Sequence, residues 1–310
     1  MDWHLKAILQ SVFSHLPSGH HVNYLFQRHV TRSFPIDENS FQDIVTWSEP
    51  HIDAIRRHHP LPLSRLQFYE FGAGYHLILP LTYYAFGVER QTIVDINQLI
   101  RPELINESIV KFRELDIALH LPRRPSRLVD ERCLIPSLKA LYGIEYRAPC
   151  DARATGLPEG SVDCITSTST LEHISPTDIQ AILRECHRIL RPDGMMTAMV
   201  DYLDHYSFFD KNISGYNFLR YSDSAWKMFN PSLHFQNRLR HSDYVALFKS
   251  CGFRIIESRR REGSAADLEA VQQVSLDRKF ARYELQDLIA RGGFFTLSKA
   301  DAELTEAPRA

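Results

Sequence analysis

Paired cysteines, long apolar runs and a surplus of either charge are all missing from this chain of 310 residues. Its five cysteines are widely spaced with no Cys-x-x-Cys pair, so we expect neither disulfides nor a cysteine zinc site. The apolar stretch at residues 77–86 is far shorter than the roughly 20 residues of a membrane helix, and the N-terminus has no secretory pattern. A net charge of −2 provides no electrostatic drive toward nucleic acid. These absences predict a cytoplasmic protein without a membrane or nucleic-acid partner.

The composition that remains is that of a globular protein, with 44% hydrophobic and 24% charged residues. Apolar residues recur at helical spacing within 3–13 and again within 36–58, which predicts an N-terminal helical cap over residues 1–60. The Pro-rich joint His59-Pro60-Leu61-Pro62 marks its end. We expect one larger domain over 61–300 and a loose tail over 301–310.

From residue 66 onward, short apolar runs alternate with helical patterns, which predicts an α/β fold with a doubly wound, mostly parallel sheet of seven strands. The helix over 242–250 is predicted to begin with Ser242 as its cap and to end at Gly252. Residues 202–240, after the fifth strand, break the alternation and are predicted to form a substrate lid. The predicted strands are 67–71, 92–96, 144–148, 163–167, 195–201, 253–259 and 294–298, and the other helices are 77–86, 102–116, 177–190 and 267–290.

The strongest local motif is a strand that ends in Gly72-Ala73-Gly74. Such a turn lets the backbone approach a ligand closely and directs helix N–H groups into the crevice. Asp95 ends the next predicted strand, where a carboxylate can accept hydrogen bonds from ribose hydroxyls. Together these residues predict a nucleoside-binding cleft. A dinucleotide-dependent dehydrogenase is an alternative, but its third glycine would fall at Leu77.

Residues 66–299 resemble the class I S-adenosylmethionine-dependent methyltransferases, which have a Rossmann-like fold. The resemblance lies in the acidic-glycine turn, although His76 stands where a third glycine is usual, and in the segments 151–152, 156–163, 167–174 and 182–194. It implies S-adenosylmethionine as cofactor and S-adenosylhomocysteine as product. The cofactor-binding residues that it implies are Glu70, Gly72, Ala73, Gly74, Asp95, Ile96, Asp151, Ala152, Ser167 and Thr168.

A hydroxyl acceptor needs a base, because its proton must leave as the new bond forms, whereas a thioether acceptor needs none. Three candidates follow strands at the predicted ligand-binding edge of the sheet: His173 after the fourth, and Asp204 and His205 after the fifth. His173 can also simply shape the cofactor pocket, and Asp204 either orients His205 or ends the strand. The adjacent pairs His20-His21 and His58-His59 lack a third ligand, so no metal site is predicted.

The aromatic and polar side chains of the lid are the predicted acceptor pocket, because aromatic bodies exclude water while polar groups orient a ligand. Asn23, Tyr24, Arg28 and Arg32 of the N-terminal segment are possible further contributors. The predicted substrate-binding residues are Tyr202, Tyr206, Phe209, Tyr216, Asn217, Arg220, Trp226 and Arg238.

The leading hypothesis is methyl transfer to the oxygen of a small polar metabolite or a sugar-containing acceptor. Two alternatives stay open: S- or N-methylation of an amino-acid-like metabolite, and a non-catalytic cofactor-binding subunit that regulates or scaffolds a partner. A small-molecule acceptor is the expected partner, and a homo-oligomer is compatible with the sequence.

Overall fold

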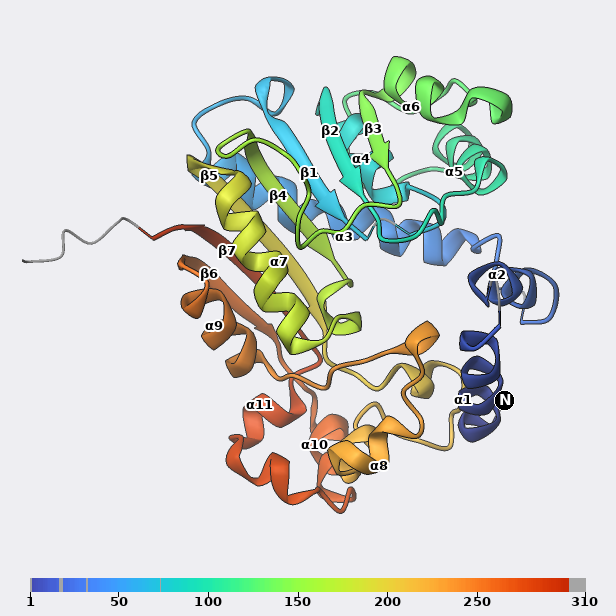
Figure 1. The fold of residues 1–310 in the computed structure, drawn as a ribbon, viewed down its shortest axis with the longest axis vertical. Helices are drawn as coiled ribbons and strands as arrows, with labels where there is room; N and C mark the ends of the chain where they lie inside the picture. The colour runs from blue at the N-terminus through green and yellow to red at the C-terminus, as the bar shows by residue number, and fades with distance from the viewer. Residues whose placement is uncertain (1, 17–18, 32, 73, 301–310) are drawn as a thin grey trace, which may run out of the picture.

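The computed structural model describes residues 2–16, 19–31, 33–72 and 74–300. Within them, seven strands form one sheet in the order β3-β2-β1-β4-β5-β7-β6, and only β7 runs antiparallel to its neighbours (Figure 1). The predicted fold class is confirmed, and every predicted strand is present with ends that shift by a few residues. The strands are Gln67–Phe71 (β1), Arg90–Val94 (β2), Ile144–Arg147 (β3), Val162–Thr168 (β4), Leu190–Asp201 (β5), Phe253–Arg261 (β6) and Gly292–Lys299 (β7).

Helices connect and cover these strands, and no helix of the described residues is long and apolar enough to cross a membrane. Three of them, α2, α6 and α8, were not predicted. The helices are Trp3–Ser14 (α1), Gly19–His29 (α2), Glu38–His58 (α3), Ile78–Phe86 (α4), Pro102–Glu114 (α5), Leu134–Tyr142 (α6), Pro176–Ile189 (α7), Asp223–Lys227 (α8), His241–Ser250 (α9), Ala265–Gln272 (α10) and Leu285–Ile289 (α11).

Two helix predictions were wrong in detail. The stretch 267–290 is not one helix, because α10 ends at Gln272 and a separate 3-10 turn, capped by the Asp277 carboxylate, precedes α11. Ser242 is not the cap of α9. The carboxylate of Asp243 accepts the N–H of Arg240 at the start of that helix, while the Ser242 hydroxyl donates to Asp287.

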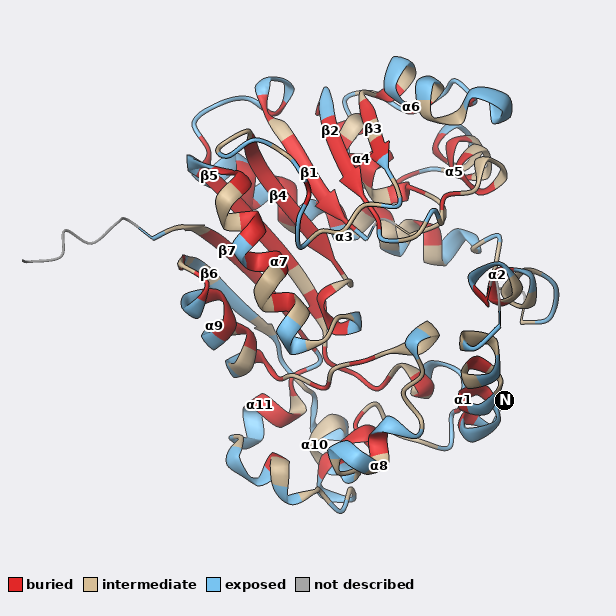
Figure 2. Ribbon diagram, viewed as in Figure 1, coloured by how far each residue is buried: buried red, intermediate tan, exposed pale blue. Residues whose placement is uncertain are grey.

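The sheet lies between two layers of helices (Figure 1). On one face, α7 and α9 share a hydrophobic core with β4, β5 and β7. On the other, α3 and α4 pack against β1, β4 and β5. The central strand β4 is buried along its whole length, as Figure 2 shows, since both of its faces are covered. The carboxyl end of β4 is therefore fixed at the edge of the sheet where the parallel strands end.

Helix α3 belongs to this layered core even though it precedes the Pro-rich joint. His51 is fully buried, with Nδ1 hydrogen-bonded to Thr197 on β5 at 2.7 Å and Nε2 to Thr168 on β4 at 3.1 Å. Helix α1 lies away from the sheet (Figure 1), and its Trp3 is buried in the core of the segment that follows β5. The backbone N–H of Trp3 donates to Asp210 in that segment.

Candidate active site

The carboxyl ends of β1, β2, β3 and β4 meet at one edge of the sheet and border a cavity of about 600 Å³. Ligands of open α/β sheets bind at such an edge. The cavity walls come from Gly72, Gly74, Asp95, Ile96, Asn97, Asp151, Ala152, Arg153, Ser169, Thr170, His173, Asp178, Ser232 and Phe235, among others. Six predicted cofactor-binding residues therefore line one cavity: Gly72, Gly74, Asp95, Ile96, Asp151 and Ala152.

The glycine turn after β1 has a backbone that other residues adopt with difficulty, with φ of 77° at Gly72 and 67° at Gly74. A Cβ at Gly72 would lie 2.6 Å from Cγ2 of Thr170, whereas a Cβ at Gly74 would meet nothing within 4 Å. The turn is thus close-packed at its first glycine and open at its second. Ala73 lies outside the described residues.

Asp95 follows β2 and faces the cavity from a nearly buried position. One carboxyl oxygen accepts the N–H of Asn97 at 3.1 Å. Burial disfavours the charged form and raises the pKa of Asp95 to about 6. A ligand that donates hydrogen bonds to this carboxylate would replace part of the water that it has lost.

Asp151 lies across the same cavity but is held by an arginine that the sequence analysis did not single out. Arg153 contacts the Asp151 carboxylate at 2.7 Å and the Asp178 carboxylate at 2.5 Å. The guanidinium lowers the pKa of Asp151, and the Ser175 hydroxyl together with the guanidinium lowers that of Asp178, so both carboxyl groups stay ionised. Arg153 is two positions from Asp151 in the sequence. Asp178 lies on α7 and becomes a neighbour only in the fold.

Three predicted cofactor residues do not border the cavity. Glu70 is buried behind the glycine turn, where one carboxyl oxygen lacks a hydrogen-bond partner and burial raises its pKa to about 8. Ser167 and Thr168 are buried inside β4, and Thr168 is bonded to His51. The next two residues, Ser169 and Thr170, are the ones that reach the cavity because β4 ends there.

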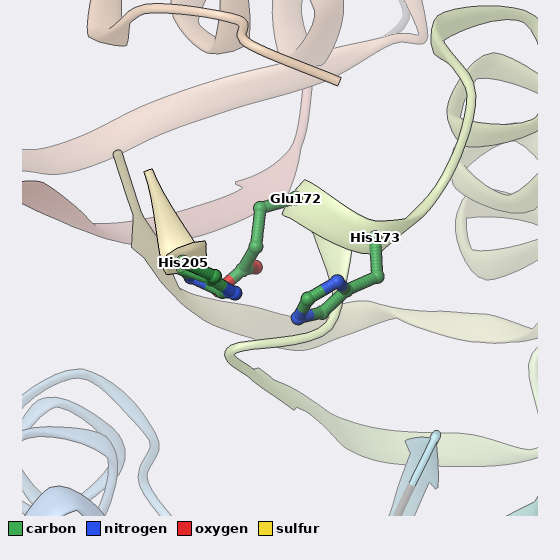
Figure 3. A group of neighbouring side chains, drawn as sticks. All are labelled: Glu172, His173 and His205. Atoms are coloured by element: carbon green, nitrogen blue, oxygen red, sulfur yellow. The ribbon is translucent and has the colours of Figure 1, made fainter. Parts of the chain in front are cut away.

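His173 stands in the cavity wall in a defined tautomer. Its Nδ1 lies 2.8 Å from the carbonyl oxygen of Phe235, and since a carbonyl can only accept, Nδ1 carries the proton. Nε2 therefore keeps a free lone pair. The His205 ring lies beside it, with ring centroids 4.9 Å apart (Figure 3). Desolvation lowers the pKa of both residues, that of His205 to about 3, so both rings are neutral near pH 7.

Asp204 does not orient His205. Its carboxylate accepts the N–H of Tyr206 at 2.9 Å and the side-chain amide of Asn217 at 3.3 Å, and it caps the short 3-10 helix His205–Phe208. Of the two roles left open for Asp204, the structure thus supports the local one. The reason is that the chain turns sharply after β5 and directs the carboxylate into the protein.

Most of the predicted acceptor-binding side chains lie in the core of residues 202–240. Their polar atoms are already paired: the hydroxyls of Tyr206 and Tyr216 donate to backbone carbonyls at 2.6 and 2.7 Å. Arg238 is 3% exposed and binds two carbonyls and the Asp223 carboxylate. The same holds for Tyr202, Asn217 and Trp226, each of which is buried and hydrogen-bonded internally.

Phe209 and Arg220 stay accessible, and Lys6 of α1 lies over the Phe209 ring. From this segment, Ser232 and Phe235 reach the cavity instead. In the N-terminal segment, Tyr24 and Arg28 bind each other and Glu103 on α5 rather than this cavity, Asn23 is buried, and Arg32 lies outside the described residues.

A cavity bounded by a glycine turn and two opposed carboxylates suits an adenosyl group. The close backbone approach at Gly72 and Gly74 and the acceptor oxygens of Asp95 and Asp151 are the features that the resemblance leads one to expect. The residues present therefore fit S-adenosylmethionine.

Comparison with known proteins agrees with this fit. Residues 136–198 match the family described as methyltransferase domain. With the strand order and the cavity, this match defines an α/β methyltransferase fold. The match shows a methyltransferase domain, and the cavity beside it fits S-adenosylmethionine as cofactor. No curated protein matches the chain.

Several solved structures are similar over most of the chain. A methyltransferase from Methanosarcina mazei is 16% identical with a TM-score of 0.45, and the match covers 79% of this chain and 96% of that one. The 1,6-didemethyltoxoflavin-N1-methyltransferase of Burkholderia thailandensis, solved with its substrate and S-adenosylhomocysteine, is 14% identical with a TM-score of 0.46 and 92% coverage of both chains.

Proposed function

We propose that this methyltransferase acts on a hydroxyl oxygen of a small polar acceptor, such as a sugar-containing metabolite. The observation that carries the proposal is the neutral imidazole of His173, whose Nδ1–H is engaged by Phe235 while Nε2 keeps its lone pair at the cavity wall. A base at this place is what an oxygen acceptor requires and a thioether does not.

The cofactor would be held by the residues that line the cavity. Asp95 would accept hydrogen bonds from the ribose, and Asp151 with the backbone of Ala152 would contact the adenine. Thr170 would support the glycine turn beneath it. When bound, S-adenosylmethionine supplies a methyl carbon that moves to the acceptor oxygen while the carbon–sulfur electron pair stays on sulfur.

The chain's own task is to hold the acceptor and receive its proton. Nε2 of His173 has the free lone pair that can take the hydroxyl proton. Phe235 and the covering segment would limit water at the site. A cavity of about 600 Å³ has the size of a small-molecule site rather than of a macromolecular interface.

Titration of the protein with S-adenosylhomocysteine tests the cofactor site. We expect Asp95→Ala to weaken binding about 10- to 100-fold, since hydrogen bonds to a charged group contribute about 1.5–3 kcal/mol. Asp53→Ala, on the exposed face of α3, is the matched control and should bind like the wild type. Because the pKa of Asp95 is about 6, affinity should fall as the pH drops below that value and the carboxylate takes up a proton.

Release of S-adenosylhomocysteine from S-adenosylmethionine, measured over a panel of hydroxylated metabolites and glycosides, tests the reaction. His173→Ala should keep its affinity for S-adenosylhomocysteine and lose most of the turnover. A wild-type protein that does not bind S-adenosylhomocysteine would refute the cofactor assignment. Undiminished turnover in His173→Ala would refute the base.

A further inference from the structure

Three potential metal ligands meet at the acceptor side of the cavity. Glu172 and His173 lie on the 3-10 turn Leu171–His173 that follows β4, and His205 opens the 3-10 helix that follows β5. Because β4 and β5 are parallel neighbours, their carboxyl ends lie side by side. One ligand atom from each residue lies within 4.8 Å of the other two, and Figure 3 shows the carboxyl group and both rings facing a common space.

Glu172 is a buried carboxyl group whose hydrogen-bonding capacity is only partly satisfied. Its side chain is 1% exposed; one carboxyl oxygen accepts the N–H of Asp201 at 3.2 Å, and the other oxygen has no hydrogen-bond partner. A buried, half-satisfied carboxylate is costly unless a cation compensates it. Burial raises its pKa to about 8, and the charged neighbour that adds to this rise is another carboxylate, Asp201.

His173 is already oriented as a ligand. Metal-binding histidines commonly donate one ring N–H to a backbone carbonyl, which fixes the tautomer and directs the other nitrogen at the ion. The bond from Nδ1 of His173 to Phe235 has this form. His205 is held by stacking on Phe208, with ring centroids 5.1 Å apart.

We infer that Glu172, His173 and His205 form a binding site for a divalent transition-metal ion of the zinc type. Two imidazole nitrogens and one carboxylate oxygen suit zinc and its neighbours better than magnesium or calcium, which prefer oxygen ligands alone. Bond lengths of about 2.0–2.2 Å require the three ligands to draw together slightly from their present spacing.

Lys6 of α1 is a cation near the site, and its charge adds to the lowering of the His205 pKa. Burial lowers the pKa of Lys6 to about 7, so a bound cation would favour its neutral form. Three protein ligands leave coordination positions open for an oxygen of the acceptor. This role rests on the proposed function, in which the acceptor is a hydroxyl. With an ion bound, Nε2 of His173 would be a ligand, so the ion would take over from His173 the activation of the hydroxyl, whose proton would pass to solvent.

Metal binding can be measured without any turnover. Untagged, metal-free wild-type protein is titrated with ZnCl₂ by calorimetry, and Co²⁺ is added separately to follow its visible absorption. We expect one tight equivalent of Zn²⁺, and a Co²⁺ spectrum of low-symmetry coordination. Glu172→Gln, which retains an acceptor for the Asp201 N–H, and His205→Ala should each weaken binding about 10-fold or more.

His58→Ala is the matched control, because His58 forms a histidine–carboxylate pair with Glu257 elsewhere on the chain. It should retain the tight equivalent. Failure of the wild type to bind Zn²⁺ above the level of the variants would overturn the inference, as would unchanged affinity in Glu172→Gln and His205→Ala. S-adenosylhomocysteine titrations of the wild type keep the outcomes apart: a wild type that binds S-adenosylhomocysteine but not Zn²⁺ contradicts the metal site alone, and a wild type that does not bind S-adenosylhomocysteine contradicts the proposed function.

Discussion

Gly72 and Gly74 share a left-handed backbone but differ in their surroundings. We expect Gly72→Ala to destabilise the protein by about 2–4 kcal/mol, because backbone strain adds to the 2.6 Å contact with Thr170. Gly74→Ala, with open space around it, should cost only the strain of about 1–2 kcal/mol. Urea unfolding measures both values, and Thr170→Ser in the Gly72→Ala background should restore part of the loss by removing Cγ2. Equal losses of unfolding free energy in Gly72→Ala and Gly74→Ala would contradict the difference in packing between the two glycines.

For single residues, the sequence predicted which side chains reach the cofactor side of the cavity better than which reach its acceptor side. Asp95 and Asp151 reach the cavity because they directly follow strands whose ends the fold aligns. Tyr206 and Arg238 have the composition of a binding site, but they satisfy their polar atoms internally. Composition cannot distinguish these two uses, since both require the same polar groups.

Helix α3 is joined to the sheet by a buried polar contact in addition to its apolar face. Burial lowers the pKa of His51 to about 3, below its usual value of 6.5, so the unfolded chain binds the extra proton between these two values. Stability should therefore fall as the pH drops from 6.5 toward 3. His51→Gln should reduce that dependence by up to one proton, about 1.4 kcal/mol per pH unit.

Urea unfolding between pH 4 and pH 7 tests this linkage, with His120→Gln at the exposed surface as the control. The control should follow the wild-type pH dependence. If the unfolding free energy of His51→Gln also follows the wild-type pH dependence, His51 is not the titrating group.

The sequence predicted where helices and strands end when hydrophobic periodicity is strong. The predictions failed where a capping side chain determines the end of an element. All seven strands were predicted because each is an apolar run bounded by turn residues. The break between α10 and α11 was missed because Asp277 caps the intervening turn through its own side chain. Helix α6 was missed although Gly143 ends it in the left-handed conformation that is typical of helix ends.

For the whole molecule, helix α1 and the segment after β5 form a unit beside the sheet. Trp3 is 3% exposed in the shared core, and its N–H binds Asp210. We expect Trp3→Ala to weaken this attachment by about 3 kcal/mol or more and to speed proteolysis within α1. Affinity for S-adenosylhomocysteine should stay close to that of the wild type, because the cofactor residues lie on the sheet.

Leu5→Ala is the control for this variant, since Leu5 is 51% exposed on the same helix. It should leave the cleavage rate unchanged. A large loss of S-adenosylhomocysteine affinity in Trp3→Ala would mean that α1 supports the cofactor site as well.

The order of strands and helices, the glycine turn and the two cavity carboxylates could be determined from sequence, because they depend on periodicity and on residues adjacent to strand ends. The meeting of Glu172 and His173 with His205 was decided by the tertiary structure alone. These residues follow different strands, and only the parallel pairing of β4 with β5 brings them together. Phe235, from the segment after α8, likewise meets His173 only in the fold, and that contact determined which ring nitrogen carries the proton.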